Sequence, residues 1–174
     1  MSDSLIRDGL VVFAKRACET CVLIENEMRR AAGERRDFRI VSQDDPQFPA
    51  GVPGVIDDRE LDWSWKNNVE SMPTLIRYQD GREVERVVGW DRSGWQRLTG
   101  IATLTRTFVE AAEGRITVLL DIVPDDDNPY AVLSAQDDGG DPLAQARVAP
   151  SFKLNRSSAV AWVEGQFKVG VAES

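Results

Sequence analysis

Histidine is absent from this sequence of 174 residues. Its absence excludes Ser-His-Asp triads, Cys-His pairs and imidazole metal ligands, and it removes the side chain that most often moves protons near neutral pH. Any acid–base chemistry must therefore use other groups.

Cysteine is nearly as scarce, with two residues, Cys18 and Cys21. Two thiols cannot build a disulfide framework, and without histidine they cannot complete the ligand set of a zinc site. We therefore expect no metal and no cofactor, and we treat the two cysteines as one pair.

Long hydrophobic runs are missing as well. No window approaches the length of a membrane span. The N-terminal stretch carries Asp3 and Asp8 and only a short apolar run over Leu10–Ala14, so it resembles neither a signal peptide nor an anchor. We expect no membrane association and a cytoplasmic location, where thiols stay reduced and a cysteine pair is more often catalytic than structural.

Positive charge is in deficit. Lysine and arginine number 21 against 29 aspartate and glutamate residues, which gives a formal net charge of −8. This balance disfavours phosphate backbones, so nucleic acid is not expected as a partner. With 42% apolar and 29% charged residues the chain is globular, and its length allows one ordinary domain with an appendage.

The first part of the chain alternates strand and helix patterns. Apolar periodicity predicts a buried strand over Leu10–Ala14, a helix from about Cys18 to Ala32, and a second strand over Phe38–Val41. A loop rich in proline and glycine over Pro46–Gly54 follows, and a helix could span Val55–Asn68.

A hairpin is indicated next. Thr74–Tyr78 and Glu83–Val88 flank an Asp-Gly turn, which favours two antiparallel strands. An amphipathic helix, capped by Ser93, is predicted to run on to Gly114. These elements predict an α/β first domain over residues 1–113.

Short extended runs separated by turns make up the remainder of the chain. They predict a small β-rich C-terminal extension over residues 114–174. The runs are Ile116–Val123, Tyr130–Ala135, Ala144–Val148, Phe152–Leu154, Ala159–Val163 and Gln166–Val171.

The segment from Cys18 to Cys21 is a CxxC motif between the first strand and the first helix. A thiolate at the first turn of a helix faces unpaired N–H groups and the positive end of the helix dipole, which lower its pKa. Lys15 and Arg16 add positive charge nearby. We expect Cys18 to be the exposed, reactive thiol and Cys21 the buried one, able to attack a mixed disulfide on Cys18.

Met72-Pro73-Thr74 lies directly before the predicted hairpin, where a proline can adopt the cis form in a tight turn. Together with the strand and CxxC segment over Val11–Cys21, it resembles the thioredoxin-like family over about residues 8 to 112. The resemblance implies a mixed sheet flanked by helices, a cis Pro73, and thiol–disulfide exchange on protein disulfides.

The resemblance also implies roles for individual residues. Cys18 would attack the substrate disulfide, Cys21 would resolve the intermediate, and Pro73 would shape the catalytic turn. The backbone around Met72 and Thr74 would bind the substrate segment. An electron donor of the thioredoxin-reductase type is a candidate partner.

Departures from the family pattern leave a second interpretation open. Val12 stands where a typical thioredoxin has a buried aspartate, and Ala17 stands where many members carry tryptophan. Without that aspartate and without histidine, Glu19 is the best side-chain candidate to accept the proton of Cys21, beside solvent and the departing thiolate. The missing acid and the unexplained extension favour the alternative, a non-catalytic thioredoxin-like interaction module within a larger assembly.

Overall fold

The computed structural model describes residues 6–101, 104, 106–111, 114–123, 130–149, 152 and 154–167. The chain forms two compact units, Met1–Leu104 and Thr105–Ser174. The division falls earlier than residue 113, because residues before that position already belong to the sheet of the second unit.

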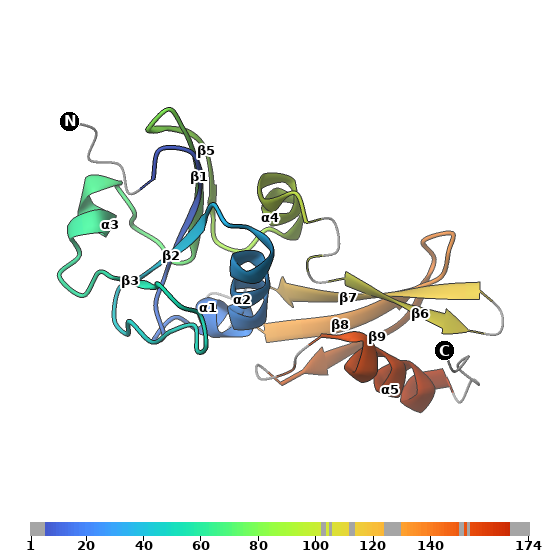
Figure 1. Cartoon of the computed structure of the whole chain (residues 1–174). Coiled ribbons are helices and arrows are strands. Elements are labelled where there is room, and N and C mark those ends of the chain that lie inside the picture. The colour runs from blue at the N-terminus through green and yellow to red at the C-terminus, as the bar shows by residue number, and fades with distance from the viewer. Residues whose placement is uncertain are drawn as a thin grey trace. The chain divides into compact units, whose positions relative to one another are not determined.

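The first unit is built on a five-stranded sheet in the order β3-β2-β1-β4-β5 (Figure 1). Its strands are β1 (Gly9–Ala14), β2 (Phe38–Ser42), β3 (Ile56–Asp57), β4 (Thr74–Gln79) and β5 (Arg82–Val88). β1, β2 and β3 pair in parallel, whereas β4 pairs antiparallel with both β1 and β5. This mixed sheet, flanked by helices, confirms the expected thioredoxin-like fold class.

β1 is the centre of the core. All residues from Leu10 to Ala14 are fully buried, as expected for a strand covered on both faces. Val11 and Phe13 share one face and cluster there with Val41, Ile76 and Tyr78 from neighbouring strands. The hydrophobic run therefore fixes the strand that leads directly to the cysteines.

In the described part of this unit the helices are α1 (Glu19–Leu23), α2 (Glu25–Glu34), α3 (Asp62–Lys66) and α4 (Arg92–Thr99). The single helix predicted from Cys18 to Ala32 is thus two helices, separated at Ile24, whose φ of −100° and ψ of 12° depart from helical values. The second of them, α2, runs two residues beyond the predicted end at Ala32 and includes Gly33.

α4 is shorter than predicted and has a different cap. Asp91, rather than Ser93, accepts the N–H of Gly94 and caps the helix. The helix ends at Thr99 because Gly100 adopts a left-handed conformation with φ of 71°, which stops helices readily. The predicted continuation to Gly114 is therefore wrong.

The helix predicted over Val55–Asn68 is also mostly wrong, since β3 occupies its beginning and only α3 is helical. The buried carboxylate of Asp58 explains where α3 starts, because it accepts the N–H groups of Trp63 at 2.8 Å and Ser64 at 3.0 Å. The hairpin of β4 and β5 is as expected, and Asp80 and Gly81 in its turn both have positive φ.

The second unit contains an antiparallel sheet in the order β6-β7-β8-β9. Its strands are β6 (Arg106–Ala111), β7 (Gly114–Val123), β8 (Tyr130–Gln136) and β9 (Pro142–Val148). The helix α5 (Arg156–Phe167) follows and packs against β6. The β-rich character expected of the C-terminal part is confirmed by this sheet.

α5 corrects the extended run predicted over Ala159–Val163. Asn155 and Ser158 cap the helix reciprocally, each side chain accepting the other residue's backbone N–H, at 2.9 and 3.0 Å. Ala159 and Val163 are fully buried at helical spacing. The run predicted over Gln166–Val171 begins in α5 and otherwise lies outside the described residues.

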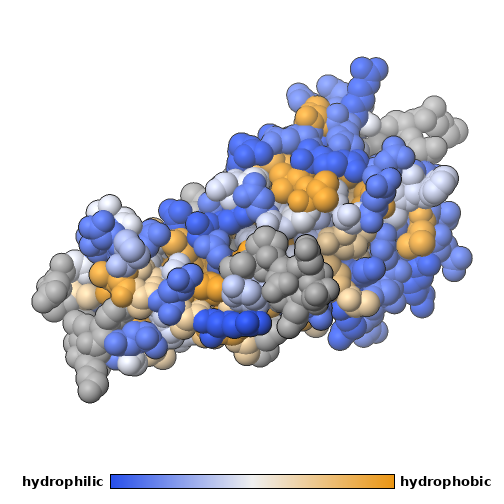
Figure 2. All heavy atoms as spheres, turned by 180° about the vertical axis from the view of Figure 1, so that it is seen from behind, coloured by the Kyte–Doolittle hydropathy of each residue, from blue (hydrophilic) through white to orange (hydrophobic). Residues whose placement is uncertain are grey.

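Within the part of the chain that the structure describes, no helix is both long and apolar enough to cross a membrane. The face drawn in Figure 2 is mainly hydrophilic, with hydrophobic residues in small groups. Among the described residues, the large apolar side chains that are exposed are Leu61, Trp65, Val84, Val88 and Leu143.

Candidate functional site

Cys18 caps the helix that follows β1. Its φ of −90° and ψ of 117° are extended, and its Sγ accepts the backbone N–H of Cys21 at 3.2 Å. A thiolate in this position faces backbone donors that have no partner within the helix, and these donors stabilise its negative charge. The sequence produces the arrangement because a buried strand ends at Ala14 and the helix begins at Glu19.

The two thiols occupy contrasting environments. Both are free, but Cys18 is partly exposed whereas Cys21 is fully buried. Hydrogen bonds from Cys21 and the charge of Lys15 lower the pKa of Cys18 to about 7, so that about half of it is thiolate at neutral pH. Burial, and then the neighbouring Cys18, raises the pKa of Cys21 far above that of an ordinary thiol.

The turn before β4 lies beside Cys18 although it is 54 residues away in the sequence. As a thiol, Cys18 Sγ donates to the carbonyl oxygen of Met72 at 3.6 Å. The Met72–Pro73 peptide bond is cis. The fold therefore brings Cys18, Cys21 and Met72 together at one site.

Thr74 is held inside this turn. Its hydroxyl donates to the carbonyl of Ser71 at 2.6 Å, and the residue is 1% exposed. Its backbone pairs with Phe13 and Val88 in the sheet. Thr74 thus anchors the turn, and Met72 is the partly exposed residue beside the thiol.

The surroundings of β1 contain no carboxylate at the position that the family resemblance singled out. Val12 is fully buried between Ile40 of β2 and Leu75 of β4. Glu19, the candidate proton acceptor, is exposed at the first residue of α1.

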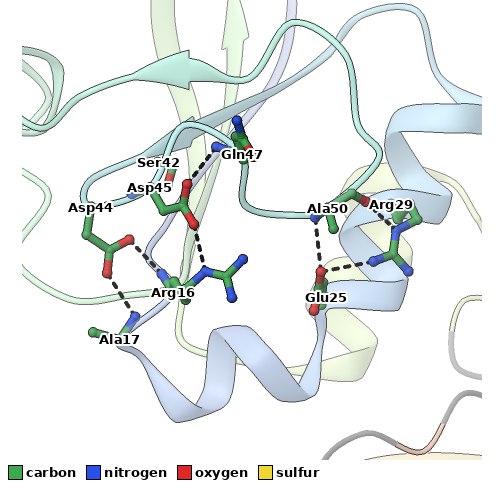
Figure 3. A network of polar contacts seen from close by, with 9 residues as sticks. All are labelled: Arg16, Ala17, Glu25, Arg29, Ser42, Asp44, Asp45, Gln47 and Ala50. Atoms are coloured by element: carbon green, nitrogen blue, oxygen red, sulfur yellow. Dashed lines mark hydrogen bonds and ion pairs between the residues drawn. The ribbon is translucent and has the colours of Figure 1, made fainter.

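Asp44 fixes the segment that leads into Cys18 (Figure 3). Its two carboxylate oxygens accept the backbone N–H groups of Arg16 at 2.7 Å and Ala17 at 2.9 Å. Asp45 adds an ion pair with Arg16, Nε to Oδ2, at 2.7 Å. These charge-assisted bonds define the backbone immediately before the thiol.

A second anchor holds the same loop to α2 (Figure 3). Glu25 Oε1 accepts the N–H of Ala50 at 3.0 Å and pairs with Arg29 at 2.9 Å, while Arg29 Nε donates to the carbonyl of Ala50 at 2.9 Å. The loop over residues 44–50 is thus tied to both sides of the cysteine segment.

Sequence reasoning did not identify either anchor. One signal pointed to Asp44 and Asp45: they lie two and three residues after the end of β2 at Ser42. Because β1 and β2 are parallel, their carboxyl ends meet at the same edge of the sheet, where the cysteine segment also begins. Among the residues that the structure describes, no group of three or more cysteine, aspartate or glutamate side chains could hold a metal ion.

Comparison with known proteins gives matches among solved structures, while no protein-family model and no curated protein matches the chain. The chain is similar to the exposed lipoprotein thioredoxin of Streptococcus pneumoniae, at 18% identity and a TM-score of 0.45, over 57% of this chain and 89% of that one. It is also similar to mitochondrial thioredoxin 3 of Saccharomyces cerevisiae, at 16% identity and a TM-score of 0.41, over 56% and 82%. A third similar structure is a secreted disulfide oxidoreductase of Mycobacterium tuberculosis, at 11% identity and a TM-score of 0.43, over 54% and 81%.

Proposed function

We propose that this protein is a thiol–disulfide oxidoreductase that exchanges disulfides with protein substrates through Cys18 and Cys21. The observation that carries the proposal is the contrast between the two thiols. Cys18 caps α1 and has a pKa of about 7, whereas Cys21 is buried and stays protonated. A nucleophile and a resolving thiol need these two states.

The first step uses the Cys18 thiolate. It attacks one sulfur of the substrate disulfide, whose S–S bond breaks as Cys18 forms a mixed disulfide. The second substrate sulfur leaves as a thiolate and takes a proton from solvent. In this proposal the backbone of Met72 binds the substrate segment and Pro73 shapes the turn; the contact of Cys18 Sγ with the Met72 carbonyl and the bond from the Thr74 hydroxyl to Ser71 support these roles.

In the second step Cys21 loses its proton and attacks the Sγ of Cys18. The mixed disulfide breaks, the remaining substrate sulfur leaves as a thiolate and is protonated, and Cys18 and Cys21 become a disulfide. Two electrons pass from the dithiol to the substrate, and an external dithiol must return them. We propose exposed Glu19 as the side chain that receives the Cys21 proton.

Trapping tests this proposal directly. Cys21→Ser removes the resolving thiol, so mixed disulfides should accumulate when the variant is incubated with a disulfide-linked peptide dimer. The matched control, Cys18→Ser, should form none. Mass spectrometry under non-reducing conditions detects the adduct. Equal adduct formation by the two variants, or none with either, would instead support a non-catalytic interaction module, which the apolar surroundings of Val12 also favour.

A further inference from the structure

A pocket of about 500 Å³ lies in the first unit, between the last turns of α2, strand β2 and the loop over residues 51–55. None of its lining residues belongs to the CxxC segment or to the turn of Met72 and Pro73. Its volume falls in the range of small-molecule binding sites. The pocket is therefore a feature separate from the proposed redox site.

The charge of the lining is opposite to that of the chain. Four of the lining residues are arginines and none is acidic, although the whole chain carries a net charge of −8. The arginines are Arg29, Arg35, Arg36 and Arg39. Such a local concentration of one sign raises the local concentration of anions.

Two of these charges are neutralised nearby. Arg29 pairs with Glu25 at 2.9 Å, and Arg35 pairs with Asp37 at 2.6 Å. Arg35 lowers the pKa of Asp37, and the charge of Arg39 contributes to the same effect. Asp37 is thus bonded to Arg35 and is already ionised.

The other two arginines of the lining, Arg36 and Arg39, carry the positive charge that remains after these two ion pairs. Both are exposed, and among the described residues no carboxylate forms an ion pair with either. Arg39 donates to the carbonyl oxygen of Arg36 at 2.7 Å and to that of Phe38 at 3.2 Å. These bonds hold the Arg39 guanidinium at the pocket and leave its other donors available to a ligand.

The rest of the lining is mainly apolar. Phe38 and Ile40 are buried in β2, while Ala32, Val52 and Val55 line the pocket and are only partly buried. The loop that carries Val52 begins directly after Ala50, which Glu25 and Arg29 anchor to α2. Apolar surface therefore lies in the same pocket as the guanidinium groups of Arg36 and Arg39.

We propose that this pocket binds a small organic phosphate. The phosphate contacts Arg36 and Arg39, and the organic part lies against Val52 and Val55. A phosphate monoester carries about −1.5 to −2 charges at pH 7, which matches the two surplus arginines better than a single carboxylate does. Guanidinium groups also bind phosphate through two parallel hydrogen bonds each.

Calorimetric titration of the full chain tests the site with three probes at equal ionic strength: adenosine monophosphate, inorganic phosphate and benzoate. We expect adenosine monophosphate to bind most tightly, because among the three probes only it combines a phosphate with an aromatic ring that can lie against the apolar lining. The variant Arg36→Gln/Arg39→Gln should weaken its binding by about tenfold or more. The matched control Arg7→Gln/Arg30→Gln removes the same charge outside the pocket and should change affinity by less than about twofold.

Several results would overturn the proposal. An equal loss of affinity for adenosine monophosphate in the two double variants would show a general effect of charge rather than a binding site. Benzoate binding as tightly as adenosine monophosphate would exclude a phosphate preference, and inorganic phosphate binding equally well would exclude contact with the apolar lining. Absence of binding by the wild-type protein at millimolar probe would refute the site outright. Cys18→Ser should bind adenosine monophosphate as tightly as the wild-type protein does, because Cys18 does not line the pocket. The binding test therefore does not depend on whether the proposed redox function is correct.

Discussion

Glu27 is a buried acid that should make the stability of this protein depend on pH. It lies in α2 with 3% of its surface exposed, and its Oε2 atom is buried without a hydrogen-bond partner. Two positive charges, on Arg30 and Arg29, act to lower its pKa, but these arginines also pair with Glu34 and Glu25. Burial therefore dominates and raises the pKa of Glu27 from 4.5 to about 7.

The sign of the effect follows from proton binding. Below pH 4.5 Glu27 is protonated in both the folded and unfolded states, so its titration does not change the free energy of unfolding. Between 4.5 and about 7 the unfolded chain releases this proton while the folded chain keeps it, so the free energy of unfolding falls as pH rises. Above the folded pKa the penalty is complete, at about 3 kcal/mol.

The substitution Glu27→Gln removes the titrating group and nearly preserves its shape. We compare the free energy of unfolding of Glu27→Gln with that of the wild type. The difference should shift in favour of the variant by about 2 to 3 kcal/mol between pH 4.5 and pH 8. Any cost of burying the amide is constant with pH and cancels in this difference. Urea unfolding followed by tryptophan fluorescence at both pH values measures it.

Glu34→Gln is the matched control, because Glu34 lies in the same helix with its side chain 48% exposed and paired with Arg30. It should show no comparable change with pH. If the stability difference between Glu27→Gln and wild type were the same at both pH values, Glu27 would have an ordinary pKa in the folded protein. The argument from burial would then be refuted.

Two further predictions concern the cysteine segment. Asp44→Ala removes both bonds to the N–H groups of Arg16 and Ala17 and should lower the free energy of unfolding by about 2 kcal/mol, measured by urea unfolding. An unchanged midpoint would show that solvent replaces these bonds without loss. The iodoacetamide alkylation rate of Cys18 should rise with pH through about 7, whereas buried Cys21 should react far more slowly. Mass spectrometry that finds Cys21 labelled first would reverse the assignment.

Much of the fold follows from local patterns in the sequence. The apolar run of β1 and the Asp80-Gly81 turn each specify their element within a few residues. Local patterns were insufficient where an apolar run fits both a helix and a strand. Ala159–Val163 is such a run, and the caps at Asn155 and Ser158 make it helical. The helix predicted beyond Thr99 failed because the left-handed Gly100 outweighs the apolar spacing that continues after it.

In the candidate site, too, local sequence patterns predicted some features and missed others. The CxxC motif and the turn at Met72 and Pro73 were recognisable because each is a short motif. The contribution of Asp44 was not, since its partners are backbone N–H groups 27 and 28 residues away in the sequence. Nearly every residue carries a backbone N–H, so the identities of the donor residues do not predict the contact. Only the parallel pairing of β1 and β2 indicates it.

The outer position of β5 has a consequence for behaviour at high concentration. β5 is the last strand in its sheet, and on one of its sides no strand among the described residues pairs with its backbone. Exposed strand edges of this kind can recruit strands of other molecules and start aggregation. Four of the seven residues of β5 are charged, with both signs present, and Glu83 and Arg86 pair at 2.7 Å. Because a second strand would have to strip water from these groups, the charge pattern of β5 protects the protein from joining edge to edge into larger sheets.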